Sequence, residues 1–143
     1  MTMPKEPPEL LESTGYLLAR VGSESRRRFV EALARKELTL AAYSVLMILG
    51  GVTDITQRQL AGAVGVDPRN LVPILDDLED RGLVTRGDHP ADRRRHAVKL
   101  SQAGRAQLTR LAEVGAKAEV ELLRPLNKQE RKQLHSLLTR LLR

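Results

Sequence analysis

The feature that most constrains the fold is the stretch from Asp54 to Gly82, DITQRQLAGAVGVDPRNLVPILDDLEDRG. Near its start, Thr56 and Gln59 have the spacing of a capping box, in which two side chains satisfy backbone amides at the beginning of a helix. The apolar residues of the short helix that follows lie on one face: Leu60, Ala61 and Val64. Gly65 then permits the tight turn that separates this helix from the next.

A second short helix follows that turn. Asp67 is a favoured N-cap residue, and Pro68 after it falls at the first helical position, where the missing N–H costs nothing. The facing apolar stripe consists of Leu71, Ile74, Leu75 and Leu78. Two short helices joined by a glycine turn, with the small Ala61 at their crossing, are typical of a helix-turn-helix, whose second helix enters the major groove of DNA. The alternative is a pair of packed helices that binds nothing.

Pro73 allows two interpretations of where the second helix begins. If Pro68 opens the helix, Pro73 lies in the interior, where it removes the hydrogen bond to the Arg69 carbonyl at a cost of roughly 3 kcal/mol. If Asn70 acts as a later N-cap, Pro73 still lies in the tolerant first turn. In the first case Arg69, Asn70 and Pro73 are expected to face base edges, where they suit guanine, adenine and a thymine methyl respectively.

The charges of these two helices predict how DNA would be approached. Gln57 and Arg58, early on the first helix, are predicted to contact phosphates and so to position the protein without reading sequence. Acidic residues crowd the second half of the second helix: Asp76, Asp77, Glu79 and Asp80. Because they oppose both phosphate and the helix dipole, only the N-terminal end of that helix is expected to enter the groove.

Two strand-forming segments come next, GLVTR at residues 82–86 and HAVKLS at residues 96–101. Most hairpin loops have roughly two to five residues, so the nine-residue loop GDHPADRRR between these segments is expected to project. Between Arg86 and Lys99 five Lys or Arg residues stand against two acids. Such a run is usually a solvated loop, but directly after a helix-turn-helix it predicts a wing that meets a minor groove or flanking phosphates. The predicted contacts are Arg86, Arg93, Arg94 and Arg95.

The first part of the chain is predicted to be helical. From Glu9 to about Lys36 apolar residues return mostly every three or four positions, which predicts one long helix, bent near Gly22. Thr39 is a fair N-cap for LAAYSVLMIL, a helix that is apolar nearly all round and that we place in the core. Gly50 and Gly51 are expected to end it by taking left-handed conformations.

The C-terminal part predicts two more helices. Ser101 can cap one that runs to about Leu123, and Asn127 with Glu130 forms a cap-type pair for the last. The last helix carries a leucine stripe: Leu134, Leu137, Leu138, Leu141 and Leu142. So much apolar surface needs a partner, most simply the first helix and the same elements of a second subunit. The alternative is packing within one monomer only.

Composition limits the remaining possibilities. The chain has 143 residues, enough for one domain. Its formal charge of +6 favours a polyanionic partner, with a generally basic surface as the alternative. The absence of cysteine excludes disulfides, thiolate metal sites and cysteine redox switches. No long apolar run or signal pattern occurs, so we expect a cytoplasmic protein with no membrane partner, and residues 1–8 as a flexible lead.

No pattern predicts catalysis. A glycine-rich phosphate loop and a His-Glu-x-x-His motif are both missing, and the paired acids lack a nearby base or nucleophile. The three histidines are scattered along the chain, so no metal site is predicted. We therefore expect neither an enzyme nor a cofactor.

Four segments, in this order along the chain, carry a resemblance to a known family: LTLAAYSVLMIL, ITQRQLAGAVGV, LDDLEDRGLVTR and DRRRHAVKLSQAGR. A wing pattern falls on Asp92, Arg94, Leu100, Ser101 and Gly104. From about Glu9 to Arg143 the chain thereby resembles the MarR family of bacterial winged-helix transcriptional regulators. The resemblance implies an obligate homodimer on a pseudo-palindromic operator, with Asp92 in the DNA-binding wing, a wing arginine in the minor groove, and release by a small, often aromatic, acid.

The expected fold is therefore mainly α with a small β-hairpin wing. A winged helix-turn-helix over about residues 39–101 is flanked by dimerisation helices over about 9–36 and 102–143, in a single domain over 9–143. The expected function is sequence-specific binding of double-stranded DNA by a homodimeric regulator, a repressor. The alternative is a winged-helix protein-interaction module, in which the basic wing meets an acidic protein surface.

An effector pocket is expected between the dimerising helices and the DNA-binding part. Tyr16, Arg20 and Tyr43 are its candidate lining residues, because an arginine suits the carboxylate of an aromatic or acidic effector. The alternative is that the two tyrosines are core or interface residues.

Overall fold

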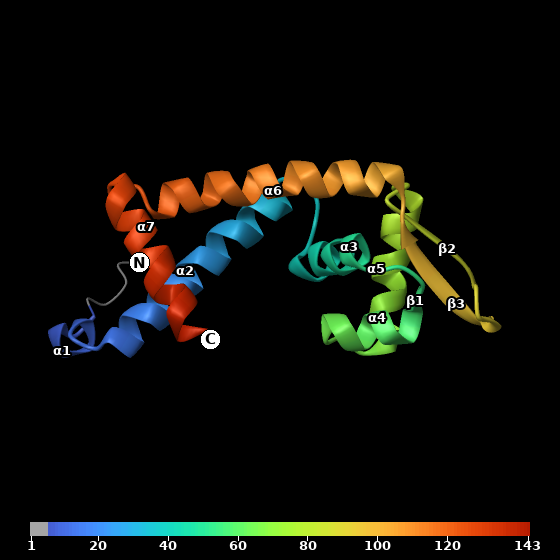
Figure 1. The fold of residues 1–143 in the computed structure, drawn as a ribbon, viewed down its shortest axis with the longest axis horizontal. Helices are drawn as coiled ribbons and strands as arrows, with labels where there is room; N and C mark the ends of the chain where they lie inside the picture. Colours follow the sequence, from blue (N-terminus) through green and yellow to red (C-terminus); the bar gives the residue numbers. More distant parts are fainter. Residues whose placement is uncertain (1–5) are drawn as a thin grey trace. The chain divides into compact units, whose positions relative to one another are not determined.

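A computed structural model describes residues 6–143, apart from the side chains of His89, Arg93, Arg94 and Arg95. Seven helices and three strands occur in this part of the chain (Figure 1). They are α1 (Pro8–Leu11), α2 (Thr14–Ala34), α3 (Leu40–Gly51), β1 (Ile55–Thr56), α4 (Gln57–Val64), α5 (Pro68–Asp80), β2 (Val84–His89), β3 (Asp92–Leu100), α6 (Gln102–Leu122) and α7 (Lys128–Leu141). This mainly helical chain with one small sheet has the predicted fold class.

The chain forms two compact units, which we describe separately. The winged unit is Ala32–Val114, and the terminal-helix unit joins the residues up to Glu31 with Gly115–Arg143. Single-domain organisation over residues 9–143 stays a prediction. Of the predicted lead, residues 1–5 lie outside the described part, whereas Pro8 already opens α1.

The winged unit holds the hydrophobic core. Its three-stranded antiparallel sheet has the order β1-β3-β2, with Thr56 opposite Ala97 and Arg86 opposite Val98. The largest fully buried side chains all belong to this unit: Leu33, Val45, Leu46, Leu49, Leu60, Leu71, Leu75, Leu78, Val84, Val98 and Leu111. Burying one such side chain contributes roughly 1.5–3 kcal/mol, so this unit carries its own apolar stabilisation.

Most predicted helix caps are present. The Thr39 hydroxyl accepts from the amide of Ala42 at 3.1 Å, and Ser101 Oγ accepts from that of Gly104 at 3.0 Å. Full capping boxes form at the starts of α4 and α7, and Gly65 ends α4 in the left-handed conformation with φ of 80°. These bonds are local, which is why sequence spacing predicted them.

The predicted helix over residues 9–36 is corrected in two ways. It is broken at Glu12 and Ser13, and α2 continues without interruption through Gly22. Ser13 Oγ accepts from the amide of Tyr16 at 3.3 Å, so the break is a new helix start with its own cap.

The predicted end of α3 was wrong. The helix runs through Gly51, extended Val52 follows it, and the left-handed glycines of the described residues are Gly65 and Gly82 instead. Gly50 has a packing role: a Cβ there would lie 2.8 Å from Leu108 Cδ1, so the missing side chain lets α6 approach.

The predicted nine-residue loop is also corrected. The strands extend to His89 and from Asp92, so only Pro90 and Ala91 connect them, and the register shifts between Asp88 and His89. The paired backbone makes a longer, narrower wing than a projecting loop would. The short strand β1 was not predicted, because its pairing with β3 is a contact between distant parts of the sequence.

Candidate nucleic-acid interface

Helix α5 begins where Asp67 caps it. Asp67 Oδ1 accepts a hydrogen bond from the backbone amide of Arg69 at 2.8 Å, and Pro68 is the first residue of the helix. The first of the two interpretations is therefore correct, and Pro73 lies inside the helix. Because proline has no N–H, the usual bond to the Arg69 carbonyl is not made.

One face of α5 is buried and the other is open. Leu71, Leu75 and Leu78 are fully buried, which confirms the predicted stripe except at half-buried Ile74. The exposed side chains near the start are those of Arg69, Asn70, Val72 and Pro73. They combine two hydrogen-bonding groups with two apolar ones, the mixture that base edges in a major groove can accept.

Sequence reasoning missed Val72. Its side chain is 40% exposed on the second turn of α5. The signal was its spacing, because a residue directly after Leu71 cannot share the leucine stripe of a helix. Next to exposed Pro73, it gives this surface a second apolar group that suits a thymine methyl.

Arg69 is positioned by the residue that caps its own helix. Its Nε lies 3.2 Å from Asp67 Oδ1, and its Nη2 lies 3.4 Å from Asp67 Oδ2, while the side chain stays 91% exposed. The hydrogen bond from the Arg69 side chain, followed by that from its amide, lowers the pKa of Asp67. A guanidinium held in this way remains free to make a bidentate contact with guanine.

Arg86 contacts helix α5. Its Nη2 lies 2.6 Å from Asp76 Oδ1 and 3.0 Å from Glu79 Oε1, and its Nε lies 3.3 Å from Glu79 Oε2. The hydrogen bond from Arg86 lowers the pKa of Glu79, and the two acids raise the pKa of Arg86. The side chain is only 24% exposed, so Arg86 braces β2 against α5, and its contact with DNA stays a prediction.

This brace also changes the electrostatics of α5. Asp76 and Glu79 are two of the four acids that were expected to oppose phosphate. Both form ion pairs with the same guanidinium group, that of Arg86. The pairing reduces their repulsion of a DNA backbone close to the wing. Sequence reasoning missed the pairing because the partners are seven and ten residues apart on different elements.

The predicted phosphate contacts Gln57 and Arg58 lie together at the start of α4. Gln57 is half-buried and Arg58 is exposed. With Thr56, Pro68 and His96 they line one cavity of about 410 Å³ in the winged unit. The structure thus brings the start of α4 close to the start of α5 and to β3.

Part of the wing lies outside the described side chains. That applies to three predicted contacts, Arg93, Arg94 and Arg95. Asp92 opens β3, is half-buried and pairs in register with His89. A DNA contact of these four residues stays a prediction.

The candidate effector residues fall in both units. In the terminal-helix unit, Arg20 Nε lies 2.6 Å from Glu6 Oε1, and a hydrogen bond with Glu6 raises the pKa of Tyr16. Tyr43 belongs to the winged unit, on α3. A common pocket for Tyr16, Arg20 and Tyr43 stays a prediction.

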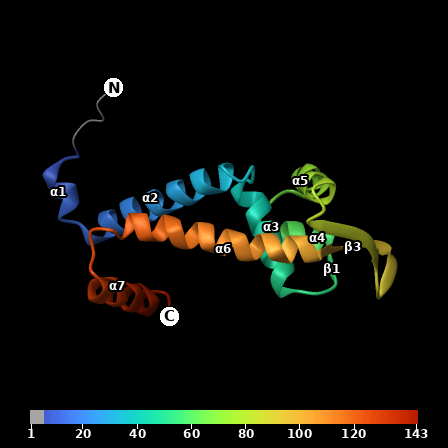
Figure 2. The same cartoon turned by 90° about the horizontal axis from the view of Figure 1, so that it is seen from above.

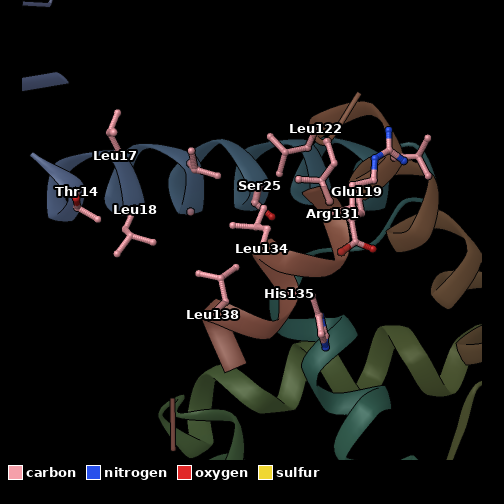
Figure 3. Close-up of a pocket in the computed structure, with 14 residues that line it drawn as sticks. Thr14, Leu17, Leu18, Ser25, Glu119, Leu122, Arg131, Leu134, His135 and Leu138 are labelled. Atoms are coloured by element: carbon pink, nitrogen blue, oxygen red, sulfur yellow. The ribbon is translucent and has the colours of Figure 1, made fainter. Parts of the chain in front are cut away.

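The terminal-helix unit has a large apolar cavity of about 610 Å³. Figure 3 shows leucines of α2 and α7 among the side chains that line it, together with polar side chains that include Glu119, Arg131 and His135. The four labelled leucines of those two helices are Leu17, Leu18, Leu134 and Leu138. No described residue of this unit is buried, so its apolar faces are unusually open.

The part of the chain that the structure describes contains no cluster of three or more His, Asp or Glu residues that could hold a metal. None of its helices is long and apolar enough to cross a membrane.

An exposed helix-turn-helix next to a β-hairpin defines the winged-helix class of proteins, many of which bind DNA. The MarR family model matches residues 38–96. Wild-type apo MarR from E. coli is 30% identical with a TM-score of 0.82, over 92% of this chain and 97% of that chain. The chain belongs to the MarR family, whose members are transcriptional regulators and not enzymes.

Three further matches are informative. The transcriptional repressor CouR bound to a 23-mer DNA duplex is 34% identical with a TM-score of 0.73, over 99% of this chain and 100% of that chain. CouR from Rhodococcus jostii RHA1 bound to p-coumaroyl-CoA is 28% identical with a TM-score of 0.67, over 92% and 93%. A Thauera aromatica protein assigned to transcriptional regulation of the hcr operon is 29% identical over 130 residues, 90% of this chain and 78% of that protein. The chain is a DNA-binding regulator.

Proposed function

We propose that this protein is a homodimeric repressor that binds a pseudo-palindromic operator and releases it when a small effector binds. The main support is the surface at the start of α5, a helix that Asp67 caps. Its exposed side chains are those of Arg69, Asn70, Val72 and Pro73. Two acids near the wing are paired with Arg86, so the adjoining surface repels phosphate less than the sequence suggests.

The terminal-helix unit supports the homodimer. None of its described residues is buried, and α7 leaves Leu137 54% and Leu141 69% exposed. In a monomer these leucines and the 610 Å³ cavity would be exposed to water. A second copy offers the same helices, and a two-fold interface between them is the simplest cover.

The wing and the net charge support binding to DNA. A formal charge of +6 attracts a polyanion, and the hairpin places Arg93, Arg94 and Arg95 on one strand, β3. Arginines on a wing suit the narrow minor groove beside the major groove that α5 would enter. A regulator of this kind works in the cytoplasm, and that location is part of the proposal.

The effector is proposed from chemistry and from one relative. CouR has been solved with p-coumaroyl-CoA, an aromatic and acidic ligand. Arg20 and two tyrosines, Tyr16 and Tyr43, offer a cation and aromatic rings for a ligand of the same class. Release would follow if the ligand favours a form of the dimer whose α5 helices no longer fit the operator.

Selection of random duplex DNA by the purified protein tests the proposal. The enriched pool is expected to share one inverted repeat, and Arg69→Ala is expected to relax the preference at one guanine in each half. Arg94→Ala is expected to weaken binding through the wing. Enrichment of no sequence, together with binding to an acidic protein surface, would favour the protein-interaction module instead.

A further inference from the structure

The cavity at the start of α4 contains a side chain that no DNA prediction includes, His96. The cavity measures about 410 Å³ and is lined by Thr56, Gln57, Arg58, Pro68 and His96. The sheet explains why these residues meet. Thr56 pairs with Ala97, so His96 lies one residue beyond the last β1–β3 pair, next to the point where α4 starts.

The side chains available in this cavity are mostly donors. Arg58 and His96 are exposed and carry ring or guanidinium N–H groups, and Gln57 adds an amide. The Thr56 hydroxyl accepts from the amide of Gln59 at 3.1 Å, which leaves its own hydrogen as a further donor. The lining found among the described residues includes no carboxylate. Such a set suits an anion with several acceptor oxygens.

Two acids adjoin the lining residues, one in sequence and one across the sheet. Asp67 precedes Pro68, and its carboxylate already accepts hydrogen bonds from Arg69. Asp88 is the cross-strand neighbour of His96, and its carboxylate can orient the imidazole by accepting one of its ring N–H groups. Neither acid removes the donors of Arg58 from the cavity.

We propose that this cavity binds one backbone phosphate of the operator, held by Arg58, Gln57 and His96. The inference rests on the proposed function and adds His96 to its contacts. Pro68 is both a wall of the cavity and the first residue of α5, so the bound phosphate lies beside the bases that Arg69 and Asn70 face. Figure 2 shows α4, α5 and β3 in the same part of the winged unit. The contact would fix the depth and register of α5 in the groove without reading a base.

Duplexes with a single neutral methylphosphonate test the proposal. The duplex is the one enriched by the wild-type protein, and the neutral group is moved one position at a time along each strand. The affinity of the wild-type protein is expected to fall when one particular phosphate in each half-site is made neutral. The affinity of His96→Ala and of Arg58→Ala is expected not to change when that same phosphate is made neutral. His96→Arg is expected to restore the sensitivity, because arginine keeps a donor there.

The salt dependence gives a second readout. Arg58→Ala removes one cation per half-site and is expected to lower the slope of log affinity against log salt by about 1 per half-site, whereas His96→Ala is judged by its methylphosphonate profile. Arg110→Ala is the matched control for Arg58→Ala, because it removes the same charge from α6, where the Arg110 guanidinium donates to Gln107. It is expected to keep the wild-type methylphosphonate profile.

Three results would overturn the assignment. One is a His96→Ala variant that keeps the full wild-type profile, and another is a His96→Arg variant that does not recover it. Saturable binding of inorganic phosphate by the DNA-free protein, lost in His96→Ala, would identify a site for a free anion instead. Failure of the wild-type protein to bind any duplex would contradict the proposed function itself, before His96 is tested.

Discussion

At the scale of single residues, Asp67 has two roles that one substitution separates. Asparagine is as good an N-cap as aspartate, but it cannot form the ion pair with Arg69. Asp67→Asn is therefore expected to leave thermal stability unchanged while relaxing the preference for guanine opposite Arg69. Asp67→Ala is expected to lose both properties, with a stability cost of about 1 kcal/mol. Thermal denaturation measures the capping role, and binding to duplexes with single base substitutions measures the guanine preference. An equal guanine preference in wild type, Asp67→Asn and Asp67→Ala would contradict the role of Asp67 in positioning Arg69.

Pro73 gives a second prediction for a single residue. Pro73→Ala supplies the missing amide and removes the ring from the Arg69 carbonyl, so the free energy of unfolding is expected to rise by about 1–3 kcal/mol. Denaturant titration measures this change. A loss of stability would contradict this prediction and show that the helix has adapted to the proline. Val72→Ala is the control for lost apolar surface.

At the scale of elements, the brace between β2 and α5 should show in the pH dependence of stability. The pKa of Glu79 is lowered in the folded state by Arg86. The corresponding stabilisation is complete above the ordinary pKa of glutamate and is lost as pH falls through the lowered value. Arg86→Met is expected to remove this part of the acid sensitivity and to weaken DNA binding, because Asp76 and Glu79 are left unpaired.

Denaturation of Arg86→Met and wild type between pH 7 and pH 3 checks the brace, with Arg110→Ala as the control for lost charge. Pairing Arg86→Met with Asp76→Asn and Glu79→Gln is expected to restore part of the DNA affinity. An unchanged pH profile in Arg86→Met would contradict the brace.

Local elements were predictable and long-range ones were not. The caps at Thr39, Thr56 and Asn127 follow from spacings within one helical turn. Strand β1 and the lengths of β2 and β3 depend on pairing across the sheet, which no local pattern contains. In the site, Arg69 and Asn70 are exposed as expected, whereas the contacts of Arg86 depend on where the folded chain places α5.

At the scale of the whole molecule, the open apolar faces predict dissociation by a single charge. Leu138 lines the apolar cavity of the terminal-helix unit. Leu138→Glu places a carboxylate in the proposed interface, so it is expected to weaken the dimer by at least tenfold and operator binding with it. Ser136→Glu on the same helix is the matched control. Sedimentation velocity gives the oligomeric state, and an unchanged dimer in Leu138→Glu would place the interface elsewhere.

The central claim is that two copies of α5 read two half-sites on one face of the duplex. Its most direct measurement is the stoichiometry and affinity on the enriched duplex, compared with one whose half-sites are moved apart by half a helical turn, roughly 5 base pairs. The account predicts two chains per duplex and a collapse of affinity on the altered spacing. One chain per duplex, or undiminished binding after the insertion, would contradict it.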